Sequence, residues 1–308
     1  MNQNLTNADN EIDLHDLFLI FWNRKFFIAA FTSIFAIFSI VYSLSLSNIY
    51  TSEAVLSPTS NENSLSSQFG NLSSLGSLAG VNLPSDSSSK SIEGIERIKS
   101  FDFFSTYFLP NINLENIMAV EEWDPQKNML VYDDSKFIKN SNTWVRDVSY
   151  PHSTIPSAQE AFEVYKKIIA IDENTKTSFI TISMSHESAI IAQKWVSIVV
   201  NQINESMRRN DQEQAKKSID FLNEAANSTS IQSIKDIIAK LLEDQIKTLM
   251  LASSNEAYVF TTIDSPIVKE KKSGPSRALI CILITFIGGL FSLILVTFHH
   301  FFITKLSK

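Results

Sequence analysis

The chain has 308 residues, a formal net charge of −7 at pH 7 and a single cysteine, Cys281. The acidic balance argues against nucleic-acid binding, which requires basic patches, and one cysteine excludes an internal disulfide. Hydrophobic residues make up 44% of the chain and are concentrated in a few stretches, which points to membrane segments.

Two long runs without charge lie near the ends of the chain. Residues 26–46 and 278–298 each contain 21 uncharged residues, and a helix of that length rises about 30 Å, the thickness of a hydrocarbon core. Buried core helices would be shorter or interrupted by polar residues. The first run is too long for the apolar part of a signal peptide, and 25 residues precede it. The sequence therefore predicts two membrane spans, the first an uncleaved anchor.

Positive charge sets the predicted orientation. Arg24 and Lys25 abut the first span, and two lysines follow the second, which favours a cytoplasmic position for both ends. The loop between the spans has 231 residues, and loops longer than about 60 residues cross the membrane largely regardless of charge. The predicted domains are a cytoplasmic tail, a span, an exported domain, a second span and a second cytoplasmic tail: 1–25, 26–46, 47–277, 278–298 and 299–308.

Three strands are predicted in the exported domain. IYTSEAVLSP (49–58) is β-branched and apolar and ends at a proline. TSFITISMS (177–185) alternates apolar and hydroxyl side chains, which is typical of a half-buried strand. AYVFTTIDSP (257–266) makes a final strand that returns to the membrane. Residues 59–90 are rich in Ser, Asn and Gly and predict a loop.

The predicted helices are longer than the strands. Apolar spacing predicts a helix over 91–108, and Ser157-Ala-Gln-Glu160 is a capping box that opens another. Residues 186–226 contain neither Pro nor Gly, and 40 helical residues would span about 60 Å. A second capping box at 229–232 precedes an apolar stripe. We therefore predict an α+β exported domain with long projecting helices, anchored by two transmembrane helices.

One stretch of the long predicted helix is polar on every side. Residues 208–218 contain only Ala215 as an apolar side chain. Such a helix stands in solvent or bridges between subunits.

Motifs for catalysis and metal binding are absent from the sequence. None of the seven glycines is followed by Lys, which excludes a P-loop, and neither an HExxH pair nor a Gly-x-Ser-x-Gly elbow occurs. His186-Glu187 lies at a predicted strand-to-helix junction, and His299-His300 lies at the predicted bilayer interface. We predict no catalytic, cofactor-binding or metal-binding residues, and not an enzyme.

The stretch PIVKEKKSGPSRALI (266–280) leads into the second span. Pro266 ends the last strand by removing a ladder donor, and Pro275 suits the first turn of a helix. Three lysines and Arg277 can reach the phosphates of anionic membrane lipids. We predict a stiff juxtamembrane hinge that uses Pro266, Pro275 and Arg277.

Small residues mark a predicted packing face on the second span. Thr285 and Gly289, like Gly288 and Ser292, are four residues apart, a spacing that lets helix backbones approach closely. Small residues are also common in membrane helices that use no such face. We expect this face to contact the other span or a membrane partner.

Segments along nearly the whole chain resemble the Wzz-type chain-length determinants of bacterial surface polysaccharides, also called polysaccharide co-polymerases. The segments that carry the resemblance, in the order expected for the family, are EIDLHDLFLIFWNRK (11–25), IYTSEAVLSP (49–58), LGSLAGVNL (75–83), IKSFDFF (98–104), VSIVVNQINESMR (196–208), AKKSIDFLNEA (215–225), YVFTTIDSPIV (258–268) and GPSRALI (274–280). The chain departs from the family where a further proline is expected between Pro266 and Pro275.

The resemblance implies an inner-membrane protein with cytoplasmic termini, a periplasmic α/β base and long helices, assembled as a ring of like subunits. It implies a non-catalytic regulator that sets the length of O-antigen or a related glycan. The implied partners are a second copy of the chain, the membrane polysaccharide polymerase, membrane lipids and, as a further candidate, the lipid-linked glycan. The missing P-loop places the chain among relatives without a kinase.

Two other classes of function stay open from the sequence. A polysaccharide-export or periplasmic adaptor also uses long helical hairpins, although adaptors usually lack a second span. A two-span sensor needs a cytoplasmic output module, and about ten residues follow the second predicted span.

Overall fold

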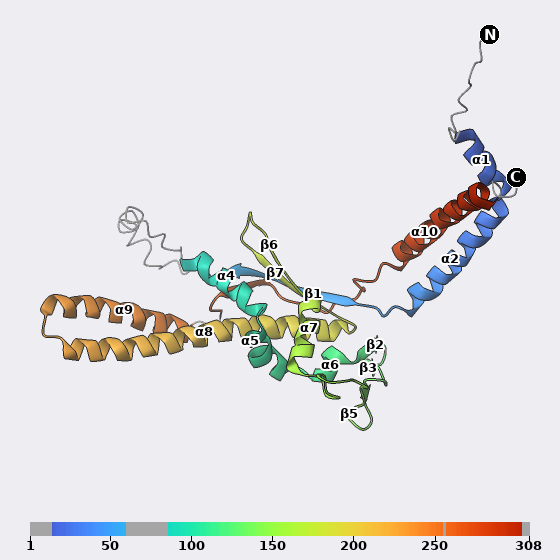
Figure 1. Ribbon diagram of the computed structural model, residues 1–308. Helices are drawn as coiled ribbons and strands as arrows, with labels where there is room; N and C mark the ends of the chain where they lie inside the picture. Colours follow the sequence, from blue (N-terminus) through green and yellow to red (C-terminus); the bar gives the residue numbers. More distant parts are fainter. Residues whose placement is uncertain (1–13, 60–85, 255–256, 304–308) are drawn as a thin grey trace, which may run out of the picture. The chain divides into compact units, whose positions relative to one another are not determined.

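The computed structural model describes residues 14–59, 86–254 and 257–303 and divides into two units (Figure 1). One unit combines 1–47 with 274–308, and the other is formed by 48–273. The loop predicted over 59–90 lies outside the described residues from 60 to 85, as do parts of the two predicted tails. Each unit is a separate body with its own internal contacts.

The first unit consists of helices from both ends of the chain. Its elements are α1 (Leu14–Asn23), α2 (Lys25–Ser45), α10 (Arg277–Phe298) and the π-helix η4 (His299–Ile303). α2 and α10 pack against each other along their length. Both are long and apolar enough to cross a membrane. The sequence analysis did not predict α1, which lies within the predicted N-terminal tail.

The second unit is organised around one four-stranded antiparallel sheet with the strand order β6-β7-β1-β8. Its strands are β1 (Tyr50–Pro58), β6 (Ile169–Glu173), β7 (Ile180–His186) and β8 (Phe260–Asp264). The three predicted strands are therefore confirmed as β1, β7 and β8. β6 was missed because it follows a helix directly, without a turn signal.

Helices and small hairpins complete this unit (Figure 1). The helices of this unit are α4 (Asp86–Ile98), α5 (Phe101–Phe103), the π-helix η2 (Phe104–Phe108), the 3₁₀ turn η3 (Leu109–Asn111), α6 (Leu114–Met118), α7 (Ala158–Ile168), α8 (Ala189–Ser228) and α9 (Gln232–Ser254). Two short antiparallel hairpins pair β2 (Val120–Asp124) with β3 (Met129–Tyr132) and β4 (Phe137–Ile138) with β5 (Thr143–Trp144).

The core lies between the sheet and the first half of α8. Ile180, Ile182 and Met184 of β7 are fully buried and alternate with partly exposed residues, as expected for a strand covered on one face. Aromatic rings fill the space between the helices: Phe104 and Phe108 each lie 5.0 Å from the ring of Tyr165. Large buried rings contribute much of the apolar area removed from water.

Two helix starts follow the predicted capping chemistry and one does not. Ser157 and Glu160 form the predicted capping box at the start of α7. At the start of α9 the predicted box is wrong, because Gln232 donates to Asp236 along its own helix instead of reaching back to Thr229. Thr229 instead accepts a weak bond from the backbone of Ile231, at 3.4 Å.

The helix predicted over 91–108 is interrupted at Ser100. The Ser100 hydroxyl accepts a bond from the Phe103 amide and so caps a new helical turn. α4 begins earlier than predicted, at Asp86, and the chain after Phe103 continues as a π-helix. The apolar side chains recur at helical spacing as predicted, but the Ser100 cap determines where one helix ends and the next begins.

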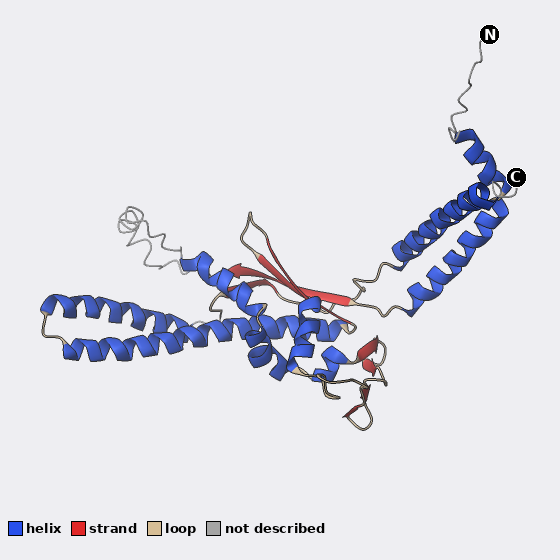
Figure 2. Ribbon diagram, viewed as in Figure 1, coloured by secondary structure: helices blue, strands red, loops and turns tan. Residues whose placement is uncertain are grey.

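The long helix α8 runs without a break through 40 residues and forms an antiparallel hairpin with α9 (Figure 2). Its first half, up to Met207, carries ten of the buried residues of the helix. Beyond Met207, in a helix that the structure describes throughout, Ala215 is the one buried residue. We call residues 208–254, the second half of α8 with α9, the arm. The α+β class with long helices is confirmed.

Candidate functional site

The segment after β8, which we call the strap (265–273), runs beside the first half of β1. Ser52 Oγ donates to the carbonyl of Ile267 at 2.8 Å, and the Ser273 amide donates to the carbonyl of Ile49 at the same distance. The Thr51 amide donates to Ser273 Oγ at 3.0 Å. The strap therefore continues along the strand after the ladder between β1 and β8 has ended.

Pro266 lies at the start of the strap, two residues after β8 ends. Proline has no amide hydrogen, so a ladder cannot continue through it. Its carbonyl is used instead, because Gln193 Nε2 of α8 donates to it at 3.2 Å. Pro266 thus lies at a point where the strap contacts both the sheet and the long helix.

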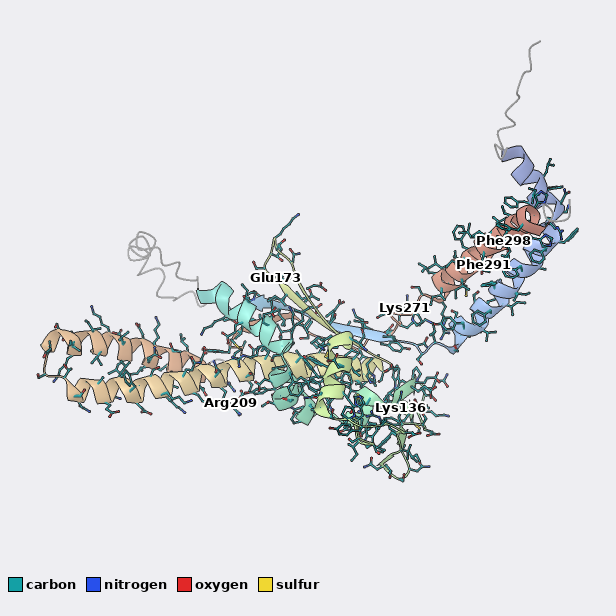
Figure 3. The ribbon with its side chains drawn as sticks, viewed as in Figure 1. Lys136, Glu173, Arg209, Lys271, Phe291 and Phe298 are labelled. Atoms are coloured by element: carbon teal, nitrogen blue, oxygen red, sulfur yellow. The ribbon has the colours of Figure 1, made fainter. Side chains whose placement is uncertain are left out.

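The lysines of the strap are mostly engaged within the same unit. Lys269 Nζ lies 2.8 Å from Glu53 Oε1, and Lys272 Nζ donates to Asn48 Oδ1 at 3.0 Å. Lys271 is exposed and makes no ion pair among the described residues (Figure 3). Of the lysines that the sequence analysis assigned to lipid contact, Lys271 is therefore the one most available for it.

Pro275 and Arg277 lie in the helical unit. Pro275 comes just before Ser276, which precedes the first residue of α10. The Arg277 guanidinium donates through Nη2 to the carbonyl of Leu46 at 2.9 Å, and Ser43 Oγ donates to the carbonyl of Arg277 at 3.4 Å. Arg277 therefore joins the beginning of α10 to the end of α2.

Gly288 allows α2 and α10 to touch. A Cβ atom at this position would lie 2.5 Å from Cβ of Phe35, closer than atoms can approach. Ser292, one turn further on, is also buried, and so is Ser39 on the opposite helix. Two of the four predicted packing residues, Gly288 and Ser292, thus lie in the contact between the apolar helices.

Thr285 and Gly289 lie to one side of that contact. They line a groove of about 650 Å³ together with Thr32, Ala36 and Ser39 of α2. A Cβ atom at Gly289 would come no closer than 3.9 Å to Thr32, so a small side chain fits there. The predicted face is therefore split between a closed contact and an open groove.

The arm exposes large apolar side chains, whereas the base buries side chains of the same kind. Phe221 of α8 is 69% exposed and Met250 of α9 is 66% exposed. Residues along α9, including Leu242, Ile246 and Met250, line a shallow groove. Of the predicted α9 stripe, Ile238 is buried and Leu249 is half-buried, whereas Ile231, Ile234 and Leu241 are exposed.

Asn204 is a functional candidate that the sequence analysis missed. This buried residue of α8 accepts bonds from the amides of Val259 and Phe260 at 2.8 and 2.9 Å, and its Nδ2 donates to the Phe260 carbonyl at 3.0 Å. The side-chain amide of Asn204 thus bonds to the backbone as a neighbouring strand would, and it holds the chain where it returns from the arm. No local signal could have identified it, because its partners lie more than 50 residues away.

His186 is a second buried polar residue, at the end of β7. The Ser188 amide donates to Nδ1 at 2.8 Å, so the ring proton lies on Nε2, which donates to the Asn116 carbonyl at 2.9 Å. Burial lowers the pKa of His186 to about 4, against the raising effect of the bond to the Asn116 carbonyl. The neutral ring joins α6 to the junction between β7 and α8.

No group of three or more His, Cys, Asp or Glu side chains is placed to hold a metal within the described ranges. His186 uses both ring nitrogens for hydrogen bonds to backbone. The features that the described residues present here are a strap, a helix pair and an arm.

Comparison with known proteins gives one family. Residues 10–108 match the family model Wzz, described as chain length determinant protein. The matched range runs from the segment before α2 through β1 to the end of η2. The resemblance to the Wzz chain-length determinants is confirmed by this match. No curated protein sequence matches the chain.

Two solved structures are similar in outline. A full-length bacterial polysaccharide co-polymerase aligns over 96% of this chain and 100% of its own, with 15% identity and a TM-score of 0.42. A fragment of WzzB, a polysaccharide co-polymerase from Salmonella Typhimurium, aligns over 74% of this chain and 100% of its own, with 14% identity and a TM-score of 0.31.

Proposed function

We propose that the chain is a non-catalytic regulator of the length of a surface polysaccharide, O-antigen or a related glycan, in the bacterial inner membrane. The observation that carries the proposal is the match of residues 10–108 to the chain-length determinant family. The absence of catalytic motifs from the sequence agrees with a regulator that acts through contact. Its partner in this role is the membrane polymerase that elongates the glycan.

The helix pair is proposed to cross the membrane. Most side chains on its outer surface are apolar and exposed, among them Phe38, Ile282 and Phe286. Exposure of so much apolar area to water would be unfavourable at about 25 cal/mol per Å², whereas lipid accepts it. With Arg24 and Lys25 at the start of α2, both ends are proposed to be cytoplasmic and residues 47–277 periplasmic.

The working form is proposed to be a ring of identical subunits. The exposed apolar side chains of the arm, such as Phe221, Ile246 and Met250, support this proposal because a neighbouring arm could bury them. Repeated head-to-tail contacts close into a ring when the rotation between neighbours is suitable. The polar side chains of α8 that no neighbouring subunit covers would then face solvent.

The strap and the start of α10 are proposed to work as a stiff joint. The bond from Ser52 fixes the strap to the sheet and the bond from Gln193 to Pro266 fixes it to α8, and the strap leads through Pro275 into α10. Arg277 fixes the start of α10 to α2. Lys271 is proposed to contact lipid phosphates at the membrane surface.

Within the helix pair we assign two roles to the four small residues. Gly288 and Ser292 hold α2 against α10, which the close approach of Phe35 supports. Thr285 and Gly289 line the open groove and are proposed to face a membrane partner.

The test is deletion of the gene, followed by electrophoresis of the surface polysaccharide. The proposal predicts that the modal length is lost while total polymer is preserved, and that the cloned gene restores the mode. Complete loss of polymer would favour an export adaptor, and an unchanged profile with an altered response to an external signal would favour a sensor. Either result overturns the proposal.

A further inference from the structure

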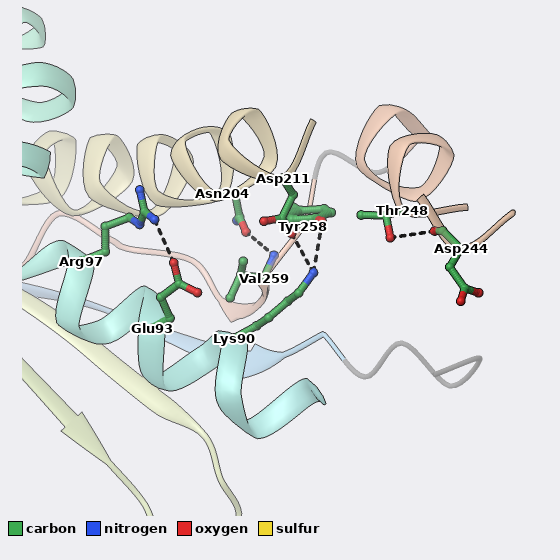
Figure 4. A network of polar contacts seen from close by, with 9 residues as sticks. All are labelled: Lys90, Glu93, Arg97, Asn204, Asp211, Asp244, Thr248, Tyr258 and Val259. Carbon is green, nitrogen blue, oxygen red and sulfur yellow. Dashed lines mark hydrogen bonds and ion pairs between the residues drawn. The ribbon is translucent and has the colours of Figure 1, made fainter. Parts of the chain in front are cut away.

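Three side chains from distant parts of the sequence meet where the arm leaves the base. Lys90 Nζ lies 2.7 Å from Asp211 Oδ2 and donates to the Tyr258 hydroxyl at 3.2 Å (Figure 4). The Tyr258 hydroxyl donates to Asp211 Oδ2 at 2.6 Å. We call these three residues the latch. They come from α4, from α8 and from the chain that returns from α9 to β8.

The latch lies at the boundary between two environments. Asp211 is one helical turn beyond Met207, where the buried part of α8 ends. The side chains of Lys90 and Asp211 are 32% and 16% exposed, so both charges are largely removed from water. Burial alone would lower the pKa of Lys90, but the hydrogen bond and charge of Asp211 raise it, so the ammonium stays charged at neutral pH.

The returning chain is held from two sides at this point. Asn204 of α8 binds the backbone of Val259 and Phe260 on one side. On the other side α4 lies so close that a Cβ atom at Gly94 would be 3.0 Å from the Phe260 ring. The latch therefore closes a place where α4, α8 and the returning chain already meet.

Most other ion pairs of the described residues do not join distant elements. The pair Arg97–Glu93, for example, links neighbouring turns of α4, and Lys99–Glu96 links the residue after the end of α4 to its last turn, so both act only locally. Lys90 and Asp211 are 121 residues apart. A contact of this kind fixes the position of one element on another.

We propose that the latch sets the angle of the arm on the base, and that this angle determines the length of the glycan. This inference rests on the proposed function, because it assigns length control to the geometry of the arm. α8 is buried on the sheet as far as Met207 and continues unbroken into the arm, where Ala252 of α9 and the polar contacts at the root hold the arm against the base. The latch joins the two chain segments that meet at that root. Asp211 lies where α8 enters the arm, and Tyr258 lies where the chain returns from α9 to β8.

An open latch would leave the arm attached but less fixed. Asn204 and the core would still hold the base together, so the subunit would stay folded. In a ring of identical subunits, the same change in arm angle would occur in every subunit and would alter the geometry of the whole ring. We expect a broader or shifted distribution of glycan lengths, with total polymer preserved.

The experiment uses a charge exchange in the full chain. Lys90→Glu and Asp211→Lys each place like charges together, and the double variant restores opposite charges with the sites exchanged. Tyr258→Phe removes one hydroxyl and is a milder variant if a charge reversal prevents folding. Lys99→Glu is the matched control, since it makes the same charge change just after the end of α4, in a pair that spans only three residues of sequence.

Two readouts are compared for every variant. Hydrogen exchange of residues 258–260 in the purified protein reports on the latch, and we expect about tenfold faster exchange in each single variant because charged hydrogen bonds are lost. The glycan profile of cells reports on length. The single variants should lose the wild-type mode, the double variant should regain it, and Lys99→Glu should match wild type in both readouts.

Failure of this inference differs from failure of the proposed function. If deletion of the gene changes the glycan mode but the single variants, with faster exchange, keep the wild-type mode, then the arm angle does not set length. Unchanged exchange in the single variants and in Tyr258→Phe would also overturn the latch. If deletion itself leaves the mode unchanged, the proposed function fails first.

Discussion

The half of α8 that lies on the sheet buries a row of apolar side chains, whereas the half that forms the arm is mostly polar and leaves its largest apolar side chain, Phe221, exposed. Trp195 is 2% exposed and packs against the rings of His186 and Phe108. Phe221, in the same helix, is 69% exposed. The base is complete within one chain, whereas the arm presents apolar surface that a single chain leaves uncovered.

This difference indicates where stability and assembly reside. Buried side chains contribute to the free energy of unfolding of the single chain. Exposed apolar side chains contribute little to it, but they contribute to association when a partner covers them. The same helix can therefore be tested for two separate properties on either side of Met207.

The largest effect is expected in the base. Trp195→Ala should lower the free energy of unfolding by about 3–5 kcal/mol, because it removes a large buried ring and leaves a cavity. Phe221→Ala in the arm should change it by less than about 0.5 kcal/mol. Denaturant unfolding of the full chain in detergent measures both. Equal losses in the two variants would show that the arm is as well packed as the base.

Acid should weaken the base through His186. Its pKa of about 4 in the folded chain lies below the value near 6.5 of an unfolded histidine, so the unfolded state binds a proton first as the pH falls. Stability attributable to this residue is complete above pH 6.5 and decreases by about 3 kcal/mol between pH 6.5 and 4. The neighbouring Glu187, whose pKa burial raises, acts in the opposite sense.

The pH effect is measured as a difference between two proteins. His186→Gln should have a smaller loss of unfolding free energy than wild type between pH 6.5 and 4, since the titrating ring is gone and Glu187 is common to both. Parallel pH profiles for the two proteins would mean that His186 does not control acid stability.

A substitution at Asn204 tests where the base ends along α8. Asn204→Ala leaves the buried amides of Val259 and Phe260 without their acceptor and should lower the free energy of unfolding by about 1–3 kcal/mol. Gln212→Ala, which removes a bond from the half-buried Gln212 side chain to the Ala252 carbonyl in the arm, is the matched control and should have a smaller effect. If Gln212→Ala is the more damaging change, the base extends further along α8 than Met207.

The smallest effect on stability is expected on the open face of α9. Met250→Glu should change the free energy of unfolding by less than about 0.5 kcal/mol, because the side chain is 66% exposed. The same change should weaken association of the full chain, which sedimentation in detergent can measure. Normal association in this variant would remove the α9 face from the proposed contact between subunits.

Sequence patterns predicted the elements that depend on local physics. The apolar runs, the alternation in β7 and the capping box at Ser157 are properties of neighbouring residues. Ser100 ends a predicted helix through one side-chain bond, which apolar spacing does not report. The stripe on α9 was recognised, but spacing alone cannot tell a face covered by its own chain from one left for a partner.

The candidate site was predicted in part. Prolines, basic residues and small residues directed attention to the strap and to the second apolar helix, but not to the partners of each side chain. Lys269 contacts Glu53 across 216 residues of sequence, and Lys90 meets Asp211 across 121. Contacts of such range are set by the topology of the sheet and of the hairpin, which a single sequence does not display.

The most direct measurement is the mass of the purified full chain in mild detergent, made beside the glycan profile of the cells that produce it. The account predicts a high-order assembly of identical subunits together with a defined modal length. A protein that is monomeric under these conditions and in crosslinked membranes, while the cells keep a normal modal length, would contradict it.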